Sequence, residues 1–232
     1  MNNLSLAEQK MSLMGEILLC SLLGKILFGE LDKAWLENLI SEDVFAEAPF
    51  GAEQAETQHG IELLQHWTKD NQTGISEEEF KILKRDHLRL FIGTDRVLAP
   101  VWESVYCNDE RLVFQEETLQ VRQWFSRFGL QSELLYREPD DHIGLELSFI
   151  AHLASLALKA IESEDQQTLD ETVQAQRDFL HEHLLRWGPV WTKLVVQHAE
   201  TDFYKGVAHL TYGTLLAVAE FLKIELPEEK ML

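Results

Sequence analysis

The sequence predicts an all-α protein, a single-domain bundle of about eight to ten helices, since globular helices average ~11–12 residues. Apolar residues recur with the helical period, and all five prolines fall between the periodic runs or just past one. Strand-like alternation is thin, its best candidate being the short run Arg111–Phe114. The 232 residues are enough for one sizeable core, so the predicted domain spans 1–232, with a possible hinge near 130–140.

Three apolar segments predict the long helices. The first places Leu13, Ile17, Cys20, Gly24 and Leu27 on one face, and its small residues allow a neighbouring helix to come close. The second segment repeats the pattern at Phe149, Ile150, Leu153, Leu156, Ala157, Ala160 and Ile161. The third, Phe203 to Leu222, is apolar on nearly all sides, which is typical of a central helix.

Local signals predict several helix ends. Ser76 followed by three glutamates is a capping box that opens a helix continuing through Leu83 and Leu90. Gly129 after Phe128 is typical of a helix C-terminus. The pair Gly188-Pro189 predicts a break between one helix ending near Trp187 and another starting near Val190.

The charge is strongly unbalanced, with 20 Lys+Arg against 40 Asp+Glu and a net charge of −20. Such a surface repels phosphate, so we expect no nucleic-acid binding and no attraction to an anionic membrane, whereas a basic peptide is compatible. The apolar stretch Leu13–Phe28 contains Glu16 and Lys25 and is short for a membrane span, and no basic secretory signal precedes it. Cys20 and Cys107 form no CxxC pair. These features predict a cytoplasmic protein without stable membrane insertion.

Common catalytic motifs are absent, including the phosphate loop, GxGxxG, GxSxG, HExxH and the EF-hand loop. His181-Glu182-His183 offers two histidines, but residues i and i+2 of a helix point to different sides. We therefore interpret this tripeptide as a surface helix turn. An all-helical metal-dependent hydrolase that uses Asp141, His142 and a distant His181 or His209 stays open as an alternative function.

The run Glu138-Pro139-Asp140-Asp141-His142 directly precedes the apolar helix from Ile143. Capping alone can explain it, with Pro139 at the first helical position and both aspartates in the first turn. Yet glutamate is not a preferred N-cap residue, and a histidine beside two carboxylates is more than a cap requires. A structural and a functional interpretation both remain open.

The segment Leu90–Tyr106 places aromatic residues and a proline on a connection between helical runs. Since connections are usually polar surface structures, this one predicts either a lid on the core or part of an apolar groove.

These segments together resemble the TorD/DmsD family of redox-enzyme maturation chaperones. Leu90–Tyr106 is similar to the family's LFIG…P..W.SV region, and Glu138–His142 matches its E-P-x-D-H signature. The resemblance continues through Leu119–Trp124 and the C-terminal helices, covers roughly residues 80 to 205, and is closer to the dimethyl-sulfoxide-reductase chaperones. This sequence departs from close relatives at Val101, where they have proline, and at His87, where they can have tryptophan.

The resemblance implies a cytosolic, cofactor-free chaperone rather than an enzyme. Such proteins bind the twin-arginine signal peptide of a molybdenum-containing reductase, of the dimethyl sulfoxide or trimethylamine N-oxide type. They hold the apoenzyme for cofactor insertion before export. No metal site is implied. The sequence leaves open whether the chain is a monomer or a domain-swapped dimer, since long helices joined by a hinge near Glu138 would permit a swap.

Carried over residue by residue, the resemblance implies a peptide site with an apolar wall and a polar end. Glu138, Asp141 and His142 would supply the polar end, Pro139 would fix the turn, and the wall would consist of Leu90, Phe91, Pro100, Trp102 and Tyr106. Carboxylates beside an apolar groove suit a leader with two arginines followed by an apolar stretch. His142 either orients the turn or changes charge to tune release.

Overall fold

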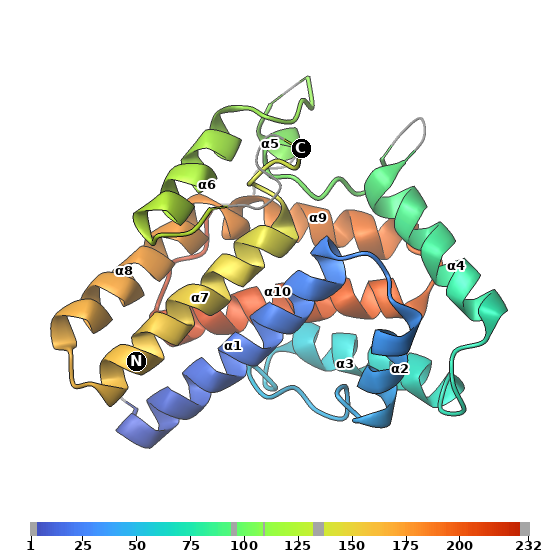
Figure 1. Ribbon diagram of the computed structural model, residues 1–232, viewed down its shortest axis with the longest axis horizontal. Coiled ribbons are helices and arrows are strands. Elements are labelled where there is room, and N and C mark those ends of the chain that lie inside the picture. Colours follow the sequence, from blue (N-terminus) through green and yellow to red (C-terminus); the bar gives the residue numbers. More distant parts are fainter. Residues whose placement is uncertain (1–3, 94–96, 109, 132–136, 228–232) are drawn as a thin grey trace. The chain divides into compact units, whose positions relative to one another are not determined.

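The computed structural model describes residues 4–93, 97–108, 110–131 and 137–227. This part of the chain contains ten α-helices, one π-helical segment and no strand, which confirms the all-α prediction (Figure 1). The elements are α1 (Leu6–Phe28), α2 (Lys33–Ser41), α3 (Ala55–Asp70), α4 (Glu77–His87), η1 (Leu88–Ile92), α5 (Ser104–Cys107), α6 (Glu116–Arg127), α7 (Ile143–Glu162), α8 (Gln166–Glu182), α9 (Leu184–His198) and α10 (Asp202–Leu222).

The chain forms two compact units, each assembled from separate stretches of sequence. The first unit consists of residues 1–28, 101–187 and 218–232, and the second consists of residues 29–100 and 188–217. The predicted hinge near 130–140 falls within the first unit, and residues 132–136 lie outside the described part.

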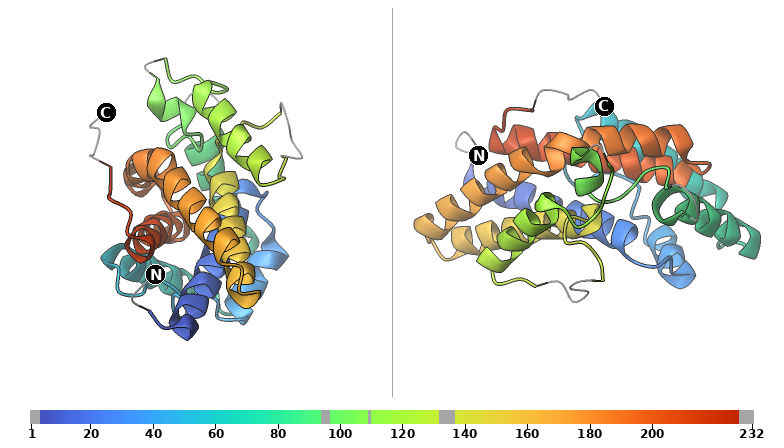
Figure 2. Two further views of the ribbon diagram at one scale, coloured as in Figure 1. Left: turned by 90° about the vertical axis from the view of Figure 1, so that its left-hand side faces the viewer. Right: turned by 90° about the horizontal axis from the view of Figure 1, so that it is seen from above.

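In the first unit, α1 packs along α7, and α7 packs along α8 (Figures 1 and 2). The two backbones of α1 and α7 approach closely at paired glycines. A Cβ atom added to Gly24 would lie 2.9 Å from the Gly144 carbonyl oxygen, and one added to Gly144 would lie 2.8 Å from that of Gly24. The close approach that the sequence predicted at Gly24 is therefore confirmed.

Both α1 and α7 are long and apolar enough to cross a membrane by length and composition. In each, half or more of the apolar window is buried inside the protein, and core helices of soluble proteins share these properties.

A buried acid lies inside this helix layer. Glu16 of α1 is fully buried and accepts a hydrogen bond from the Gln176 side-chain amide of α8. Burial raises the pKa of Glu16 to about 8, opposed by the Gln176 bond. Among the described residues neither Glu16 Oε2 nor Gln176 Oε1 has a hydrogen-bond partner, so a protonated Glu16 can return a hydrogen bond to the amide oxygen. The pair is therefore satisfied when the acid is neutral.

In the second unit, the start of α10 is fixed to α4 by Asp86. This fully buried carboxylate accepts hydrogen bonds from the backbone N–H groups of Glu200 and Thr201, both at 2.9 Å, and from the Thr201 hydroxyl at 2.8 Å. Arg89 adds an ion pair at 3.2 Å. Several charge-assisted bonds offset the cost of burying the carboxylate, so this junction is well defined.

Two predicted helix ends are confirmed and one is wrong. The Ser76 hydroxyl accepts the Glu79 N–H at 3.1 Å, and Gly129 follows α6 with φ +73°. The predicted break at Gly188-Pro189 does not occur, because α9 runs through with Pro189 inside it. The break lies at His183 (φ −120°, ψ −97°), whose ring pairs with buried Glu103. A tertiary contact therefore accompanies the end of α8, where the sequence has no glycine or proline.

The Glu16 pair leads to a prediction about stability and pH. Because the folded-state pKa is raised, the contribution of the neutral acid is complete below pH 4.5 and is lost as the pH rises through about 8. In the unaltered chain, one such group lowers the unfolding free energy by up to about 1.4 kcal/mol per pH unit over this window. We expect the unfolding free energy of Glu16→Gln to depend less on pH there. Urea unfolding at pH 5.5 and 8.5 measures it, with the exposed Glu8→Gln as control. Parallel pH profiles for Glu16→Gln and the unaltered chain would contradict the assignment.

Candidate functional site

The two motifs singled out in the sequence meet in the first unit. Trp102 and His142 form an isolated antiparallel bridge. The Ile143 N–H donates to the Val101 carbonyl at 2.8 Å, and the Glu103 N–H donates to the Asp141 carbonyl at 3.0 Å. Residues separated by about forty positions are thus held together by their backbones. We call this junction of residues 101–103 with 138–143 the corner.

Trp102 is the aromatic side chain of the corner, and it is half-buried. Its indole N–H donates to Glu138 Oε1 at 2.5 Å, and its ring lies edge-on to His142 with centroids 6.1 Å apart. Glu138 is also half-buried, and burial raises the pKa of its carboxyl group while the indole bond opposes that rise. Trp102 is therefore held in one orientation with part of its surface accessible.

The side chains of the two aspartates of the corner are buried and bonded to other residues of the protein. Asp141 is fully buried, and its two oxygens accept the Ser104 N–H at 2.8 Å and the Thr118 hydroxyl at 2.6 Å. Asp140, 1% exposed, pairs with Arg122 Nε at 2.7 Å. The sequence suggested that Asp141 would meet a peptide arginine directly. In this conformation it has no accessible oxygen and instead anchors α5 and α6 to the corner.

His142 is the N-cap residue of α7. Its Nδ1 accepts the Gly144 N–H at 3.0 Å, and its ring packs edge-on against Phe28 with centroids 5.1 Å apart. Pro139, Asp140 and Asp141 precede the helix, so the prediction that they occupy its first position and first turn is wrong. The orienting role for His142 fits this geometry, because an Nδ1 that accepts a hydrogen bond carries no proton.

Glu103 of the corner belongs to a buried group of acidic side chains that the sequence pattern did not predict. Glu103 Oε2 lies 2.7 Å from His183 Nδ1, and both side chains are almost fully buried. Burial raises the pKa of Glu103, opposed by His183. Burial, followed by the charges of Glu103 and Asp141, raises the pKa of Glu146 well above its usual value. The signal available in the sequence was a lone glutamate in each of two apolar runs.

His183 also corrects the interpretation of His181-Glu182-His183 as a surface turn. Its ring is 2% exposed. Only tertiary structure could show that Glu103, eighty positions earlier, supplies its partner.

The remaining predicted site residues are distributed over both units. In the first, Pro139 is buried, and half-buried Tyr106 stacks on Trp187 with centroids 5.2 Å apart. Leu90, Phe91 and Pro100 belong to the second unit and are buried.

Phe91 lies in an aromatic group within the second unit. Its ring contacts Tyr204 at 5.4 Å, His87 at 5.3 Å and Trp191 at 6.2 Å, measured between centroids. His87, the position where relatives can have tryptophan, thus keeps a ring contact with Phe91, and its Nδ1 lies 3.2 Å from the Tyr204 hydroxyl. An imidazole here preserves part of the aromatic packing.

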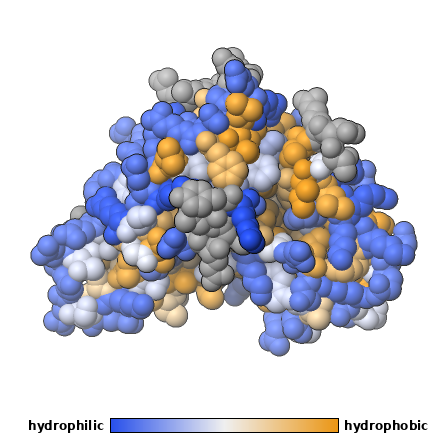
Figure 3. Space-filling model, turned by 45° about the horizontal axis from the view of Figure 1, so that its top comes forward, coloured by the Kyte–Doolittle hydropathy of each residue, from blue (hydrophilic) through white to orange (hydrophobic). Residues whose placement is uncertain are grey.

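Apolar side chains are exposed near the corner's elements. In Figure 3, which brings the top of Figure 1 forward, apolar side chains lie among hydrophilic ones in the region of α5 and α6. Among the described residues from the start of α5 to the end of α6, the exposed large apolar side chains are those of Leu112, Phe114 and Leu119.

The hydrolase alternative finds no support in the described part of the chain, where no three His, Cys, Asp or Glu side chains are grouped to hold a metal ion. His209 pairs with Glu56 at 2.6 Å in the second unit, and His181 Nδ1 lies 3.1 Å from the Glu225 carbonyl oxygen in the first. The candidate ligands therefore have separate partners.

The comparisons with known proteins first define the class. A family model described as nitrate reductase delta subunit matches residues 52–193, more than half of the chain. The chaperone protein TorD of Vibrio cholerae serotype O1 is 33% identical over 155 residues, which are 67% of this chain and 66% of that protein. The Tat proofreading chaperone DmsD of Salmonella typhi is 33% identical over 127 residues, 55% of each chain. A probable Tat proofreading chaperone DmsD of Haemophilus influenzae is 25% identical over 206 residues, 89% of this chain and 91% of that one.

The chain therefore belongs to the TorD/DmsD family of redox-enzyme maturation chaperones. It spans slightly less than two thirds of the length of the first of these relatives.

The role of Asp141 as an anchor can be measured by stability. Asp141→Ala leaves the Ser104 N–H and Thr118 hydroxyl without their buried acceptor, so we expect a loss of about 3 kcal/mol in unfolding free energy. Urea denaturation should show this loss, and Thr118→Val should add little on top of it because the two side chains share one bond. Half-buried Glu138→Gln is the matched control, with a change below about 1 kcal/mol. A fully additive Asp141/Thr118 pair would show that the bond does not stabilise the fold.

Proposed function

We propose that this chain is a cytosolic maturation chaperone that binds the twin-arginine signal peptide of a molybdenum-containing reductase. It holds the apoenzyme for cofactor insertion before export, and it performs no bond-making step itself. Membership of the TorD/DmsD family supports this proposal, as do relatives named as TorD chaperones and as Tat proofreading chaperones.

One observation carries the assignment of the site: Trp102 is partly accessible yet already fixed by Glu138 and His142. An aromatic side chain that is held before binding loses little conformational freedom when a ligand covers it. Buried aromatic anchors of this kind dominate the affinity of many interfaces. Trp102 can therefore receive the apolar part of a leader at low entropic cost.

The polar part of the corner has a more limited role than the sequence suggested. Glu138 keeps a partly accessible carboxyl group, whereas Asp140 and Asp141 hold the corner together. In this proposal Glu138 meets the ligand and Asp141 acts as a positioning residue.

The overall charge supports the same class of ligand. A net charge of −20 attracts a leader that carries two arginines and accelerates their encounter. Since such steering is screened by salt, binding weakens as ionic strength rises.

The type of client reductase is a separate question. Relatives named TorD and relatives named DmsD both match this chain, so their names favour neither the trimethylamine N-oxide nor the dimethyl sulfoxide reductase. Identification of the reductase that co-purifies from the native cytosol answers it.

The site assignment predicts that Trp102→Ala weakens binding of a synthetic leader in which two arginines precede an apolar stretch. Loss of an aromatic anchor costs ~2–4 kcal/mol, which corresponds to an increase in Kd of about 30- to 1000-fold. Calorimetric titration measures the Kd. The control is Trp124→Ala, which removes a half-buried indole from α6 in the same unit.

Equal Kd values for Trp102→Ala and the unaltered chain would exclude the corner as the site. Absence of leader binding by the unaltered chain would exclude the function itself.

A further inference from the structure

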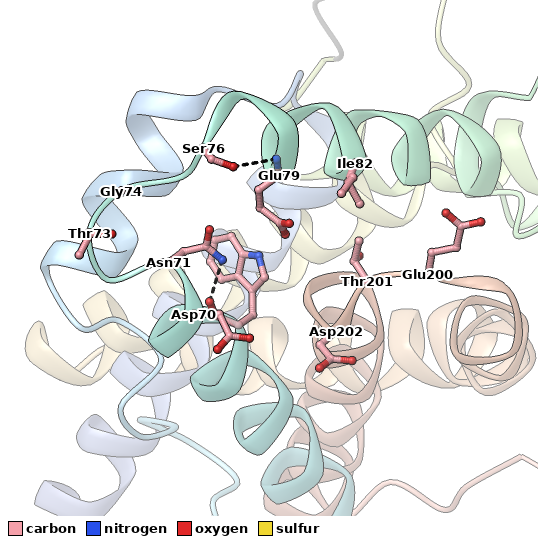
Figure 4. Close-up of a pocket in the computed structure, with 11 residues that line it drawn as sticks. Asp70, Asn71, Thr73, Gly74, Ser76, Glu79, Ile82, Glu200, Thr201 and Asp202 are labelled. Carbon is pink, nitrogen blue, oxygen red and sulfur yellow. Dashed lines mark hydrogen bonds between the residues drawn. The ribbon is translucent and has the colours of Figure 1, made fainter.

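The second unit contains a cavity of about 500 Å³ that the corner does not include (Figure 4). Its walls come from the end of α3, the connection to α4, the first turns of α4, and the start of α10. The hydrogen bonds of Asp86 to Glu200 and Thr201 fix one wall relative to another. The cavity is therefore formed before any ligand binds.

Carboxylates reach this cavity from three elements. Asp70 ends α3, Glu79 lies in the first turn of α4, and Asp202 begins α10. Among the described residues no lysine or arginine lines the cavity, and the basic side chain beside two of the acids is that of His66, whose Nδ1 lies 3.9 Å from Asp70 and 3.3 Å from Asp202. The cavity therefore has more hydrogen-bond acceptors than donors, and few basic side chains balance the charge of its carboxylates.

The carboxylate of Glu79 lacks the partner that a helix N-terminus usually gives it. In a complete capping box its carboxylate would accept the Ser76 N–H, yet only the Ser76 hydroxyl bond to the Glu79 N–H is present. Within the described residues the Glu79 carboxylate has no hydrogen-bond or ion-pair partner, and Figure 4 shows it directed from α4 into the cavity. By contrast, Glu200 at the edge is paired with Arg85 at 2.9 Å and Arg89 at 2.8 Å.

A second observation is independent of the acids. Trp67 also lines the cavity, is only 4% exposed, and its indole Nε1 has no hydrogen-bond partner in the described part of the chain. A buried N–H without an acceptor is costly, which indicates that a ligand or water completes it. The wall therefore offers a donor as well as several carboxylates.

A peptide satisfies both demands. Its backbone carbonyl groups are acceptors, and an arginine side chain presents five N–H donors to carboxylates. A metal ion alone would leave the indole N–H of Trp67 without a hydrogen-bond acceptor. In addition, the described carboxylates are not grouped to hold a metal ion.

We propose that this cavity binds an arginine of a basic peptide, with Glu79, Asp70 and Asp202 as the acceptors of the guanidinium and Trp67 as a donor to the peptide backbone. This inference rests on the proposed function, and the residues that line the cavity all belong to the second unit.

The test compares two leaders, one with paired arginines and one with both replaced by glutamine, on the same set of variants. We expect Glu79→Gln combined with Asp202→Asn to raise the Kd of the arginine leader about 10-fold or more, since hydrogen bonds to charged groups are among the stronger ones. The glutamine leader should bind the variant and the unaltered chain equally. The salt dependence of the arginine leader should also become shallower.

The matched control is Glu78→Gln, which removes the same charge from the same turn of α4 but does not line the cavity. Thermal unfolding of each variant verifies folding. Glu79→Lys supplies a second measurement, because it should weaken the arginine leader and strengthen one with glutamates at both positions.

The outcomes are distinguishable. If the cavity variants bind the arginine leader as tightly as Glu78→Gln while Trp102→Ala weakens it, the cavity assignment is overturned and the proposed function stands. If neither leader binds any form of the chain, the proposed function fails.

Discussion

The corner depends on the buried carboxylate of Asp141. A charged group with no exposure is costly unless every oxygen is bonded, and here a backbone N–H and a hydroxyl meet the two oxygens. Those two bonds connect the start of α5 and the first turn of α6 to the residues before α7. The backbone bridge between Trp102 and His142 then follows, and with it the fixed orientation of the indole.

Carboxylates serve three different purposes in this acidic chain. Some, such as Asp86 and Asp141, are buried and saturated with donors, so they define junctions between helices. Others, such as Glu16, Glu103 and Glu146, are buried with few donors, and burial raises the pKa of each above its usual value. A third group, represented by Glu79, is accessible and without partner among the described residues. Acceptors for a ligand remain in this third group and at Glu138, whose carboxyl group is partly accessible.

The Glu138–His142 motif and the cavity of the second unit differ in how many carboxylates they leave accessible to a ligand. Glu138–His142 contains three acids, but the fold leaves only Glu138 partly accessible. Conversely, Asp70, Glu79 and Asp202 form no motif, because they come from three elements and Asp202 is far from the other two in the sequence. Recognition of a basic ligand requires unsatisfied acceptors, and their location follows from hydrogen bonding rather than from charge counting.

The sequence by itself determined the helical class, the three long apolar helices, the Ser76 and Gly129 ends, and the family. It did so because apolar period and caps depend on residues within a few positions of one another. It could not determine that α8 ends at His183, that α9 continues through Pro189, or that Asp141 is an anchor, since each depends on a partner remote in sequence. Only the tertiary structure decides such matters, because burial and long-range pairing set which side chains keep a free donor or acceptor.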